Sequence, residues 1–485
     1  MKFVTATLLL VLVQLVQQQT NAFQTPSTTT SSSLSRLFMQ PNLKERVTTG
    51  TSSDLSAVSE SLLYDDGMGS RSRSDTSIPN ASVLEEFLVP VLSTALLITG
   101  NTVGASMLVL PDLAAGPGMA ISSGVLIGAY LMNLMSGLCI AQVAIRQYEA
   151  SGDEVPSSFK EFAQKNLFQS AGSIVSGISI FVNSLVLAFD TTKAGQVLES
   201  FTSGSDSMVL LWAVMMLGIV STQSLARLSQ VASVLVVGLF ASFAGLLLPG
   251  LANVADPLAV LTSGPATNDL DLMATILHMT PVLVTTLVYQ NIVPTVTRIL
   301  EYDRTKVVTA ITLGSVFPLC IYLAWCVAVL GGGVETSLSS TGGGVDLFTI
   351  FSFVTVAGSS IGALMSLSEE FEILLGKEKG DKFSLPSVAL PSIIALGVCQ
   401  LFQDDISGAL KVAGSYGSPL LYGIIPVAMT YLQQRRQQMS PQSDLLTSAR
   451  TVMPGGMTGL GFLGLGASAL VGSEVAMTFS QLAGT

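Results

Sequence analysis

The chain has 485 residues, of which 49% are hydrophobic and only 11% are charged, and its mean hydropathy is +0.62. Soluble domains are about one quarter charged, so this composition excludes an ordinary soluble domain and indicates an all-α polytopic membrane protein. The net charge of −11 argues against a nucleic-acid partner, because phosphate backbones are bound by basic patches.

Histidine and cysteine are rare in the chain, and their spacing does not resemble that of a metal site. The chain has one histidine, and its four cysteines lie singly inside apolar runs without zinc-like or disulfide spacing. We therefore expect no metal site and no cofactor.

The N-terminal 82 residues have the composition of targeting segments. Residues 1–22 combine Lys2, a short apolar run that begins at Leu8 and small residues up to Ala22, which is typical of a secretory signal peptide. Residues 23–82 begin with Phe23, are rich in Ser and Thr and carry no acidic residue before Lys44, so we expect a transit-peptide-like, disordered segment. The two together resemble the bipartite presequence of algae with secondary plastids. They predict a plastid (chloroplast) membrane, with an endomembrane or plasma membrane as the alternative.

Residues 83–485 form the predicted transmembrane domain. Eleven apolar runs approach membrane-spanning length, at 87–113, 120–145, 168–198, 207–224, 229–250, 272–297, 306–331, 346–368, 386–402, 406–432 and 456–479. With the N-terminus on the positive side, thirteen of the fifteen Lys and Arg after residue 82 fall on that side, as the positive-inside rule requires.

The first span is interrupted at its middle by residues that make poor helix interior. These are Gly100, Asn101, Thr102, Gly104 and Ser106, with Ala105 among them. Unwound backbone is tolerated at membrane depth only where it lines a cavity or is buried in protein, and transporters build substrate sites in this way. The alternative is that Gly100 and Gly104, four residues apart, form a helix-packing face.

The sixth span is interrupted in a similar way. Tyr289, Gln290 and Asn291 put polar groups near mid-membrane, and Pro294 cannot donate a helical hydrogen bond. Interruptions at corresponding positions of two halves indicate an inverted-repeat transporter, here with repeats at 87–250 and 272–432 and an extra helix at 456–479. An ordinary proline kink is the alternative.

Several of these segments resemble the tryptophan/tyrosine permease family of the amino-acid/polyamine/organocation superfamily. Residues 100–111 resemble its first-helix signature and 281–298 its sixth helix. Ser359 and Ser360 with Gly362 look like its eighth helix, and 409–429 is similar to its tenth. At Asn291 and its neighbours, and at Asp190, the chain departs from the residues usual in the family.

The resemblance implies a leucine-transporter-like fold of five plus five inverted helices, in which helices 1 and 6 are discontinuous. It also implies an amino-acid substrate and a coupling ion, usually a proton. The substrate carboxylate would meet the amides of Gly104 to Ser106, its ammonium the carbonyls around Leu287 to Tyr289, and an aromatic side chain would pack on Tyr289. The predicted substrate-binding residues are Gly100, Asn101, Thr102, Gly104, Ala105, Ser106, Leu287, Tyr289, Gln290, Asn291, Ser359 and Ser360.

Acidic side chains inside spans are functional candidates, because a charge at the bilayer centre costs on the order of 2.5–3.5 kcal/mol. Asp190 is a candidate for proton coupling. Alternatively it forms a partly solvated ion pair with Lys193, three residues on and on the same helix face. Glu370, at the positive-side end of its span, is a second candidate, with simple interfacial solvation as the alternative.

These features predict a secondary active transporter, not an enzyme, that carries tryptophan or tyrosine with protons by alternating access. Another neutral amino acid or an amine, with proton or sodium coupling, is the alternative. A membrane-embedded enzyme is disfavoured because no catalytic cluster or nucleotide-binding loop is present, and a structural protein would not need broken helices. The expected partners are an amino acid and the lipid bilayer; the sequence does not indicate the oligomeric state.

Overall fold

The computed structural model describes residues 81–152, 155–156, 159–201, 208–265, 271–334, 346–377, 380–403, 405–438 and 456–483. These residues form helices and no strands. The predicted signal peptide (1–22) and residues 23–80 of the predicted transit-like segment lie outside the described residues.

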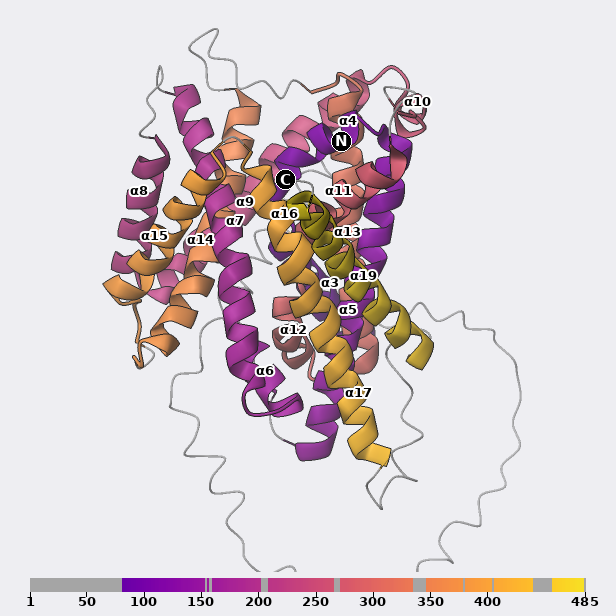
Figure 1. Ribbon diagram of the computed structural model, residues 1–485, viewed down its shortest axis with the longest axis vertical. Coiled ribbons are helices and arrows are strands. Elements are labelled where there is room, and N and C mark those ends of the chain that lie inside the picture. The colour runs from indigo at the N-terminus through magenta and orange to yellow at the C-terminus, as the bar shows by residue number, and fades with distance from the viewer. Residues whose placement is uncertain are drawn as a thin grey trace, which may run out of the picture.

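The first half of the chain contributes the helices of the first predicted repeat (Figure 1). In chain order they are α3 (Ala81–Thr102), η1 (Ala105–Val109), α4 (Leu110–Ala115), α5 (Met119–Ser151), α6 (Phe159–Asn166), α7 (Ala171–Phe201), α8 (Met208–Thr222), α9 (Leu225–Asn253) and α10 (Pro257–Leu261).

The second half contributes the second predicted repeat and one further helix. These are α11 (Leu272–Thr286), η2 (Gln290–Ile292), α12 (Val293–Ile299), α13 (Arg304–Leu330), α14 (Leu347–Leu374), α15 (Leu385–Leu401), α16 (Ser407–Val412), η3 (Ala413–Gly417), η4 (Leu420–Ile424), α17 (Ile425–Gln438) and α19 (Gly456–Ala483).

Each of the eleven predicted spans coincides with a helix or a group of consecutive helices. Among the described residues, eight helices are long and apolar enough to cross a membrane, and the bent pair formed by α3 with η1 and α4 makes a ninth. The fourth and ninth predicted spans coincide with α8 and α15, apolar helices of 15 and 17 residues. The all-helical, polytopic architecture is confirmed, and the number of eleven spans stays a prediction.

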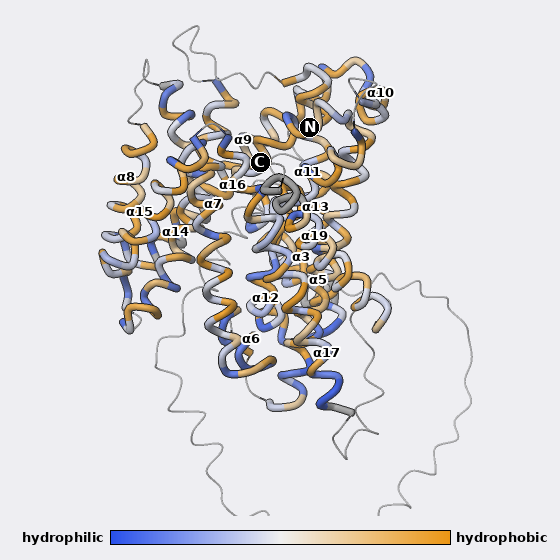
Figure 2. The backbone as a smooth tube through the Cα atoms, in the orientation of Figure 1, coloured by the Kyte–Doolittle hydropathy of each residue, from blue (hydrophilic) through white to orange (hydrophobic). Residues whose placement is uncertain are grey.

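The charge distribution of the helices agrees with the predicted orientation. Hydrophilic residues gather at the ends of the bundle, notably at α6 and at the end of α17, while the middle is mostly hydrophobic (Figure 2). The last turn of α17 carries Arg435 and Arg436, and that of α6 carries Lys165. At the same end Arg304 forms an ion pair with Glu149, with an N–O distance of 3.0 Å.

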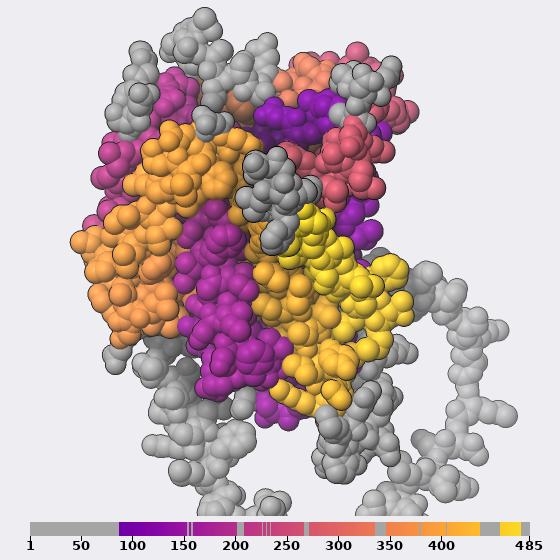
Figure 3. Space-filling model, viewed as in Figure 1, coloured from indigo at the N-terminus to yellow at the C-terminus, as the bar shows by residue number. Residues whose placement is uncertain are grey.

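The interior is built by a few tightly packed helix pairs. α14 packs on α7 and α9, and α13 packs on α3 and α5. Both broken segments, α3–α4 and α11–α12, therefore contact the same two helices, α5 and α13. On one face of the molecule α7 reaches the surface between α15 and α17 (Figure 3).

The tenth predicted span departs from regular helix. Its middle turns, η3 and η4, are π-helical, a form that occurs mostly as short bulges and often at functional sites. A Cβ atom added to Gly414 in η3 would overlap the carbonyl oxygen of Pro281 in α11. A glycine at this position thus lets the span lie directly against the helix that leads into the second break.

Candidate functional site

The first break separates α3 from η1 and α4. α3 ends at Thr102, Gly104 is extended with φ −137° and ψ −169°, and the two parts of the span meet at a bend of 57°. The amide of Met107 donates to the carbonyl of Gly104 at 3.1 Å. The amides of Gly104, Ala105 and Ser106 make no backbone hydrogen bond to a described residue, as expected for the first turn of a new helix.

The second break separates α11 from η2 and α12. α11 ends at Thr286, and Tyr289 precedes η2 with φ −141° and ψ 1°. The side chains of Tyr289 and Gln290 are 1% and 0% exposed. Both turn toward α5, where the Gln290 amide nitrogen donates to Asn133 Oδ1 at 2.6 Å and the Tyr289 hydroxyl donates to the Asn133 carbonyl at 3.2 Å.

α5 is shaped to receive these two side chains. A Cβ atom added to Gly137 would overlap the Tyr289 ring and hydroxyl, so only glycine fits there without a shift. The Asn133 amide nitrogen also donates to the carbonyls of Ala129 at 2.9 Å and Val284 at 3.2 Å. The side chains of Tyr289 and Gln290 therefore fasten the second break to α5 and do not face the first break.

Two contacts join the breaks to each other. The Asn101 amide nitrogen donates to Asn291 Oδ1 at 3.2 Å, and both side chains are exposed. The hydroxyl of Tyr322, a fully buried residue of α13, lies 2.9 Å from the carbonyl oxygen of Thr102 and 3.2 Å from that of Thr286. These carbonyls end α3 and α11, so one phenol holds the carboxyl ends of both half-helices.

A buried carboxyl group lies beside the first break. Asp190 in α7 is 1% exposed and accepts a hydrogen bond from the Ser359 hydroxyl of α14 at 2.6 Å. A Cβ atom on Gly104 would lie 3.4 Å from that hydroxyl oxygen. The structure thus brings together one predicted residue from the first break, one from the eighth span and the acid of the third span.

The ion pair between Asp190 and Lys193, the alternative for this acid, is not formed. The Lys193 ammonium instead donates to Gln196 Oε1 at 3.1 Å and lies 5.9 Å from the centre of the Phe189 ring. Within the described ranges, Ser359 supplies the hydrogen bond to Asp190.

The remaining predicted residues lie outside this group. Ser360 is fully buried and accepts a hydrogen bond from the Trp212 indole of α8 at 3.2 Å. The Thr102 hydroxyl donates to Ile98 in its own helix, Gly100 faces Val236 of α9, and Leu287 is buried. Glu370 accepts a hydrogen bond from Ser176 near the positive-side end of α14.

The sequence analysis missed Tyr322, Asn133 and Gly137. Each lies inside an apolar run, where a lone tyrosine, asparagine or glycine gives no distinguishing signal. A polar side chain inside a span is itself a weak signal for a buried hydrogen-bonded contact.

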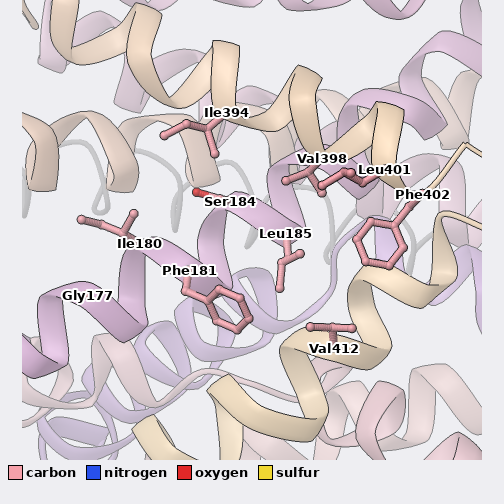
Figure 4. Close-up of a pocket in the computed structure, with 10 residues that line it drawn as sticks. All are labelled: Gly177, Ile180, Phe181, Ser184, Leu185, Ile394, Val398, Leu401, Phe402 and Val412. Atoms are coloured by element: carbon pink, nitrogen blue, oxygen red, sulfur yellow. The ribbon is translucent and has the colours of Figure 1, made fainter. Parts of the chain in front are cut away.

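One cavity lies away from the breaks. It has a volume of about 450 Å³ and lies between α7, α15 and α16 (Figure 4). Its walls are apolar, with Phe181, Leu185 and Phe402 among them, and Ser184 contributes a hydroxyl. This cavity lacks the charged or amide groups needed to bind an amino acid's ammonium and carboxylate, so we do not assign it as the substrate site.

The hydrogen bonds from the Tyr322 hydroxyl to the ends of α3 and α11 can be tested by mutation. Tyr322→Phe leaves two buried carbonyls without this donor, and we expect it to lower the stability of the folded protein by roughly 1–3 kcal/mol. Thermal unfolding in detergent measures the effect. Tyr422→Phe is the matched control, because Tyr422 is also a buried tyrosine, at 8% exposed, and its hydroxyl bonds to no described residue. Equal midpoints for the two variants would show that the bridge contributes nothing.

Known proteins resemble this chain in both sequence and fold. The model of the tryptophan/tyrosine permease family matches residues 89–458. The tyrosine-specific transport system 2 of Haemophilus influenzae is 29% identical over 249 residues, which cover 49% of this chain and 57% of that protein. Tyrosine-specific transport system 1 of the same organism is 23% identical and covers 72% of this chain and 90% of its own length.

A tryptophan-specific transport protein of Pseudomonas aeruginosa is 23% identical, with 57% of this chain and 70% of that protein covered. Among solved structures, the manganese transporter of Eremococcus coleocola, crystallised with an aromatic bis-isothiourea substituted compound, superimposes with a TM-score of 0.55. It is 12% identical and covers 83% of this chain and 90% of its own length. That transporter has the leucine-transporter-like fold, so the predicted fold is confirmed. Since the family match spans most of the chain, the protein belongs to the tryptophan/tyrosine permease family, a family of transporters and not of enzymes.

Proposed function

We propose that this permease carries an aromatic amino acid, tryptophan or tyrosine, together with a proton, by alternating access. The named relatives are tyrosine-specific and tryptophan-specific transport proteins, which supports the substrate class. The observation that carries the coupling is the buried carboxyl group of Asp190, which is hydrogen-bonded to Ser359 next to Gly104 at the first break.

The break offers complementary groups for a zwitterion. The amides of Gly104, Ala105 and Ser106, which make no hydrogen bond to the described backbone, lie at the start of η1, where the positive end of a helix dipole favours a carboxylate. The carbonyls at the ends of α3 and α11 lie at negative helix ends, which favour an ammonium. The Tyr322 hydroxyl bonds to both of these carbonyls.

A proton is a sufficient coupling ion for modest accumulation. One proton that moves down a membrane potential of 100 mV supplies about 2.3 kcal/mol. At about 1.4 kcal/mol per tenfold change, this corresponds to roughly fifty-fold accumulation of a neutral substrate. Asp190 can bind and release that proton, since a carboxyl group buried without a neighbouring cation gains from neutralisation.

Uptake into proteoliposomes that contain the full chain tests this proposal. We expect labelled tryptophan or tyrosine to accumulate about tenfold with an inward gradient of one pH unit, because that gradient supplies ~1.4 kcal/mol per proton. Unlabelled aromatic amino acids should compete, and alanine or lysine should not. Asp190→Asn should bind substrate but lose the accumulation, while Glu199→Gln, an exposed acid on the same helix, should behave as wild type. Accumulation driven by sodium alone would contradict proton coupling.

The position of Gly104 gives a second test. Gly104→Leu projects a branched side chain at Ser359 and into the space beside the amides that open η1. We therefore expect a folded protein with at least tenfold slower uptake, about 1.4 kcal/mol or more in the transport barrier. Gly104→Ala should retain uptake, because its Cβ atom meets Ser359 at an ordinary contact distance of 3.4 Å. Gly124→Leu in α5, where an added Cβ meets nothing within 4 Å, is the control. Normal uptake by Gly104→Leu would remove the first break from the site.

We also propose a plastid membrane as its location, on the composition of residues 1–82 alone. A fluorescent fusion of the full chain, expressed in an alga with secondary plastids, should label the plastid periphery. A fusion that lacks residues 23–82 should remain in the endomembranes. Plasma-membrane fluorescence of the full chain would favour the alternative.

A further inference from the structure

α7 and α14 are antiparallel neighbours joined by hydrogen bonds at two levels (Figure 1). At one level the Ser359 hydroxyl donates to Asp190 at 2.6 Å, and at the other the Ser176 hydroxyl donates to Glu370. Fourteen residues of α7 separate the two levels, which corresponds to about 21 Å of helix at 1.5 Å per residue. Both acids that the sequence suggested for proton coupling therefore belong to one interface.

Between these levels, α7 presents a row of polar residues to α14. Ser176, Ser179, Asn183 and Asp190 are spaced by 3, 4 and 7 residues. At roughly 100° per residue they fall within about 60° of one another around the helix. Phe181, about 180° away on the same wheel, lines the apolar cavity on the other side of α7 (Figure 4).

α14 presents a matching row. Ser359, Ser366 and Glu370 are spaced by 7 and 4 residues and fall within about 40° of one another. Since the hydrogen bonds at the two levels fix the register, Ser366 of α14 lies at the level of Ser179 and Asn183 of α7. We call these seven residues the polar seam.

The polar groups in the middle of the polar seam are only partly covered, and some of them have no partner among the described residues. Ser179, Asn183, Ser359 and Ser366 are all half-buried. The Asn183 amide nitrogen donates to the carbonyl of Ser179 at 2.9 Å and to its hydroxyl at 3.2 Å, which leaves the Asn183 side-chain oxygen free of described donors. The Ser366 hydroxyl has no hydrogen-bond partner among the described residues. Water is the partner that such groups take inside a membrane protein.

The polar seam carries acids at its two ends and no cation between them. α8 and α15, which also pack on α7, contain no charged residue. The charges of α6, namely Lys160, Glu161 and Lys165, lie at the Glu370 end, where Glu369 is also exposed. Lys193 lies one turn beyond Asp190 and donates to Gln196, and Lys411 of α16 pairs with Glu474.

We propose that the polar seam is the route by which the coupling proton passes between Asp190 and the positively charged side of the membrane, with Glu370 as the last titrating group. This inference rests on the proposed function. The Asp190 carboxyl group gives its proton to a water beside it, a chain of waters held midway by Asn183 and Ser366 passes one proton on, and the Glu370 carboxylate accepts a proton and releases it to the aqueous phase. Each step breaks one O–H bond and forms another.

Three variants of the full chain in proteoliposomes test the route. Asn183→Leu and Ser366→Leu replace water-holding groups by apolar ones, and Glu370→Gln removes the terminal acid. Each should lose proton-driven accumulation of labelled tyrosine by roughly tenfold at a gradient of one pH unit. Each should keep exchange of labelled for unlabelled tyrosine, because exchange requires no net proton release. A pH-sensitive dye inside the vesicles should report the same loss of substrate-induced proton flux.

Matched variants separate this outcome from a folding defect. Ser366→Thr keeps the hydroxyl and should restore accumulation. Ser184→Val changes a serine of α7 that faces the apolar cavity and should have no effect. Accumulation that survives in all three test variants would overturn the route, and a joint loss of exchange and accumulation would assign the polar seam to substrate movement instead. If accumulation by the wild-type chain does not depend on the proton gradient, the proposed function and this inference both fail. If accumulation does depend on the gradient, the variants test the proton route alone.

Discussion

The hydroxyl of Tyr322 and the side-chain amide of Asn133 hold the two interrupted helices in place. In a bilayer, each backbone group without a partner costs several kcal/mol, so a helix can stop at mid-membrane only where other groups take over its hydrogen bonds. The Tyr322 hydroxyl lies within 3.2 Å of the carbonyls that end α3 and α11, and Asn133 donates to Val284, two residues before the end of α11. A phenol has one proton, so Tyr322 serves the two carbonyls in turn and ties the two breaks to each other.

This arrangement divides the polar groups of the breaks into two kinds. The carbonyls at the carboxyl ends have partners from α13 and α5, while the amides that open η1 make no bond to the described backbone. The side chains of Tyr289 and Gln290 also have partners within the protein, since both are buried and bond to Asn133. The scaffold helices thus fix the shape of the breaks, and the exposed Asn101 and Asn291 bond to each other across them. Under the proposed function, the amides that open η1 are the groups that receive the substrate carboxylate.

The sequence predicted the all-helical fold, the order of the apolar segments and both breaks, because these features depend on local composition. Runs of apolar residues and the positions of Gly100, Gly104 and Pro294 are visible without tertiary contacts. The partners of the site residues were not predictable in this way. Ser359 lies 169 residues from Asp190, whereas Lys193 lies on the same helix face and was the nearer choice. Helical periodicity shows which residues share a face, and only the packing of α7 on α14 shows what that face meets.

The position of Asp190 connects the break to the polar seam. As a carboxylate, Asp190 accepts a hydrogen bond from the Ser359 hydroxyl. A protonated Asp190 has an O–H group of its own to donate, so the Ser359 hydroxyl is released to turn elsewhere. The nearest unwound backbone is that of Gly104, whose added Cβ would lie 3.4 Å from the Ser359 oxygen. If Asp190 binds the coupling proton, as proposed, its protonation changes which group faces the amides that open η1. A single hydroxyl then links the charge state of α7 to the site at which the substrate binds.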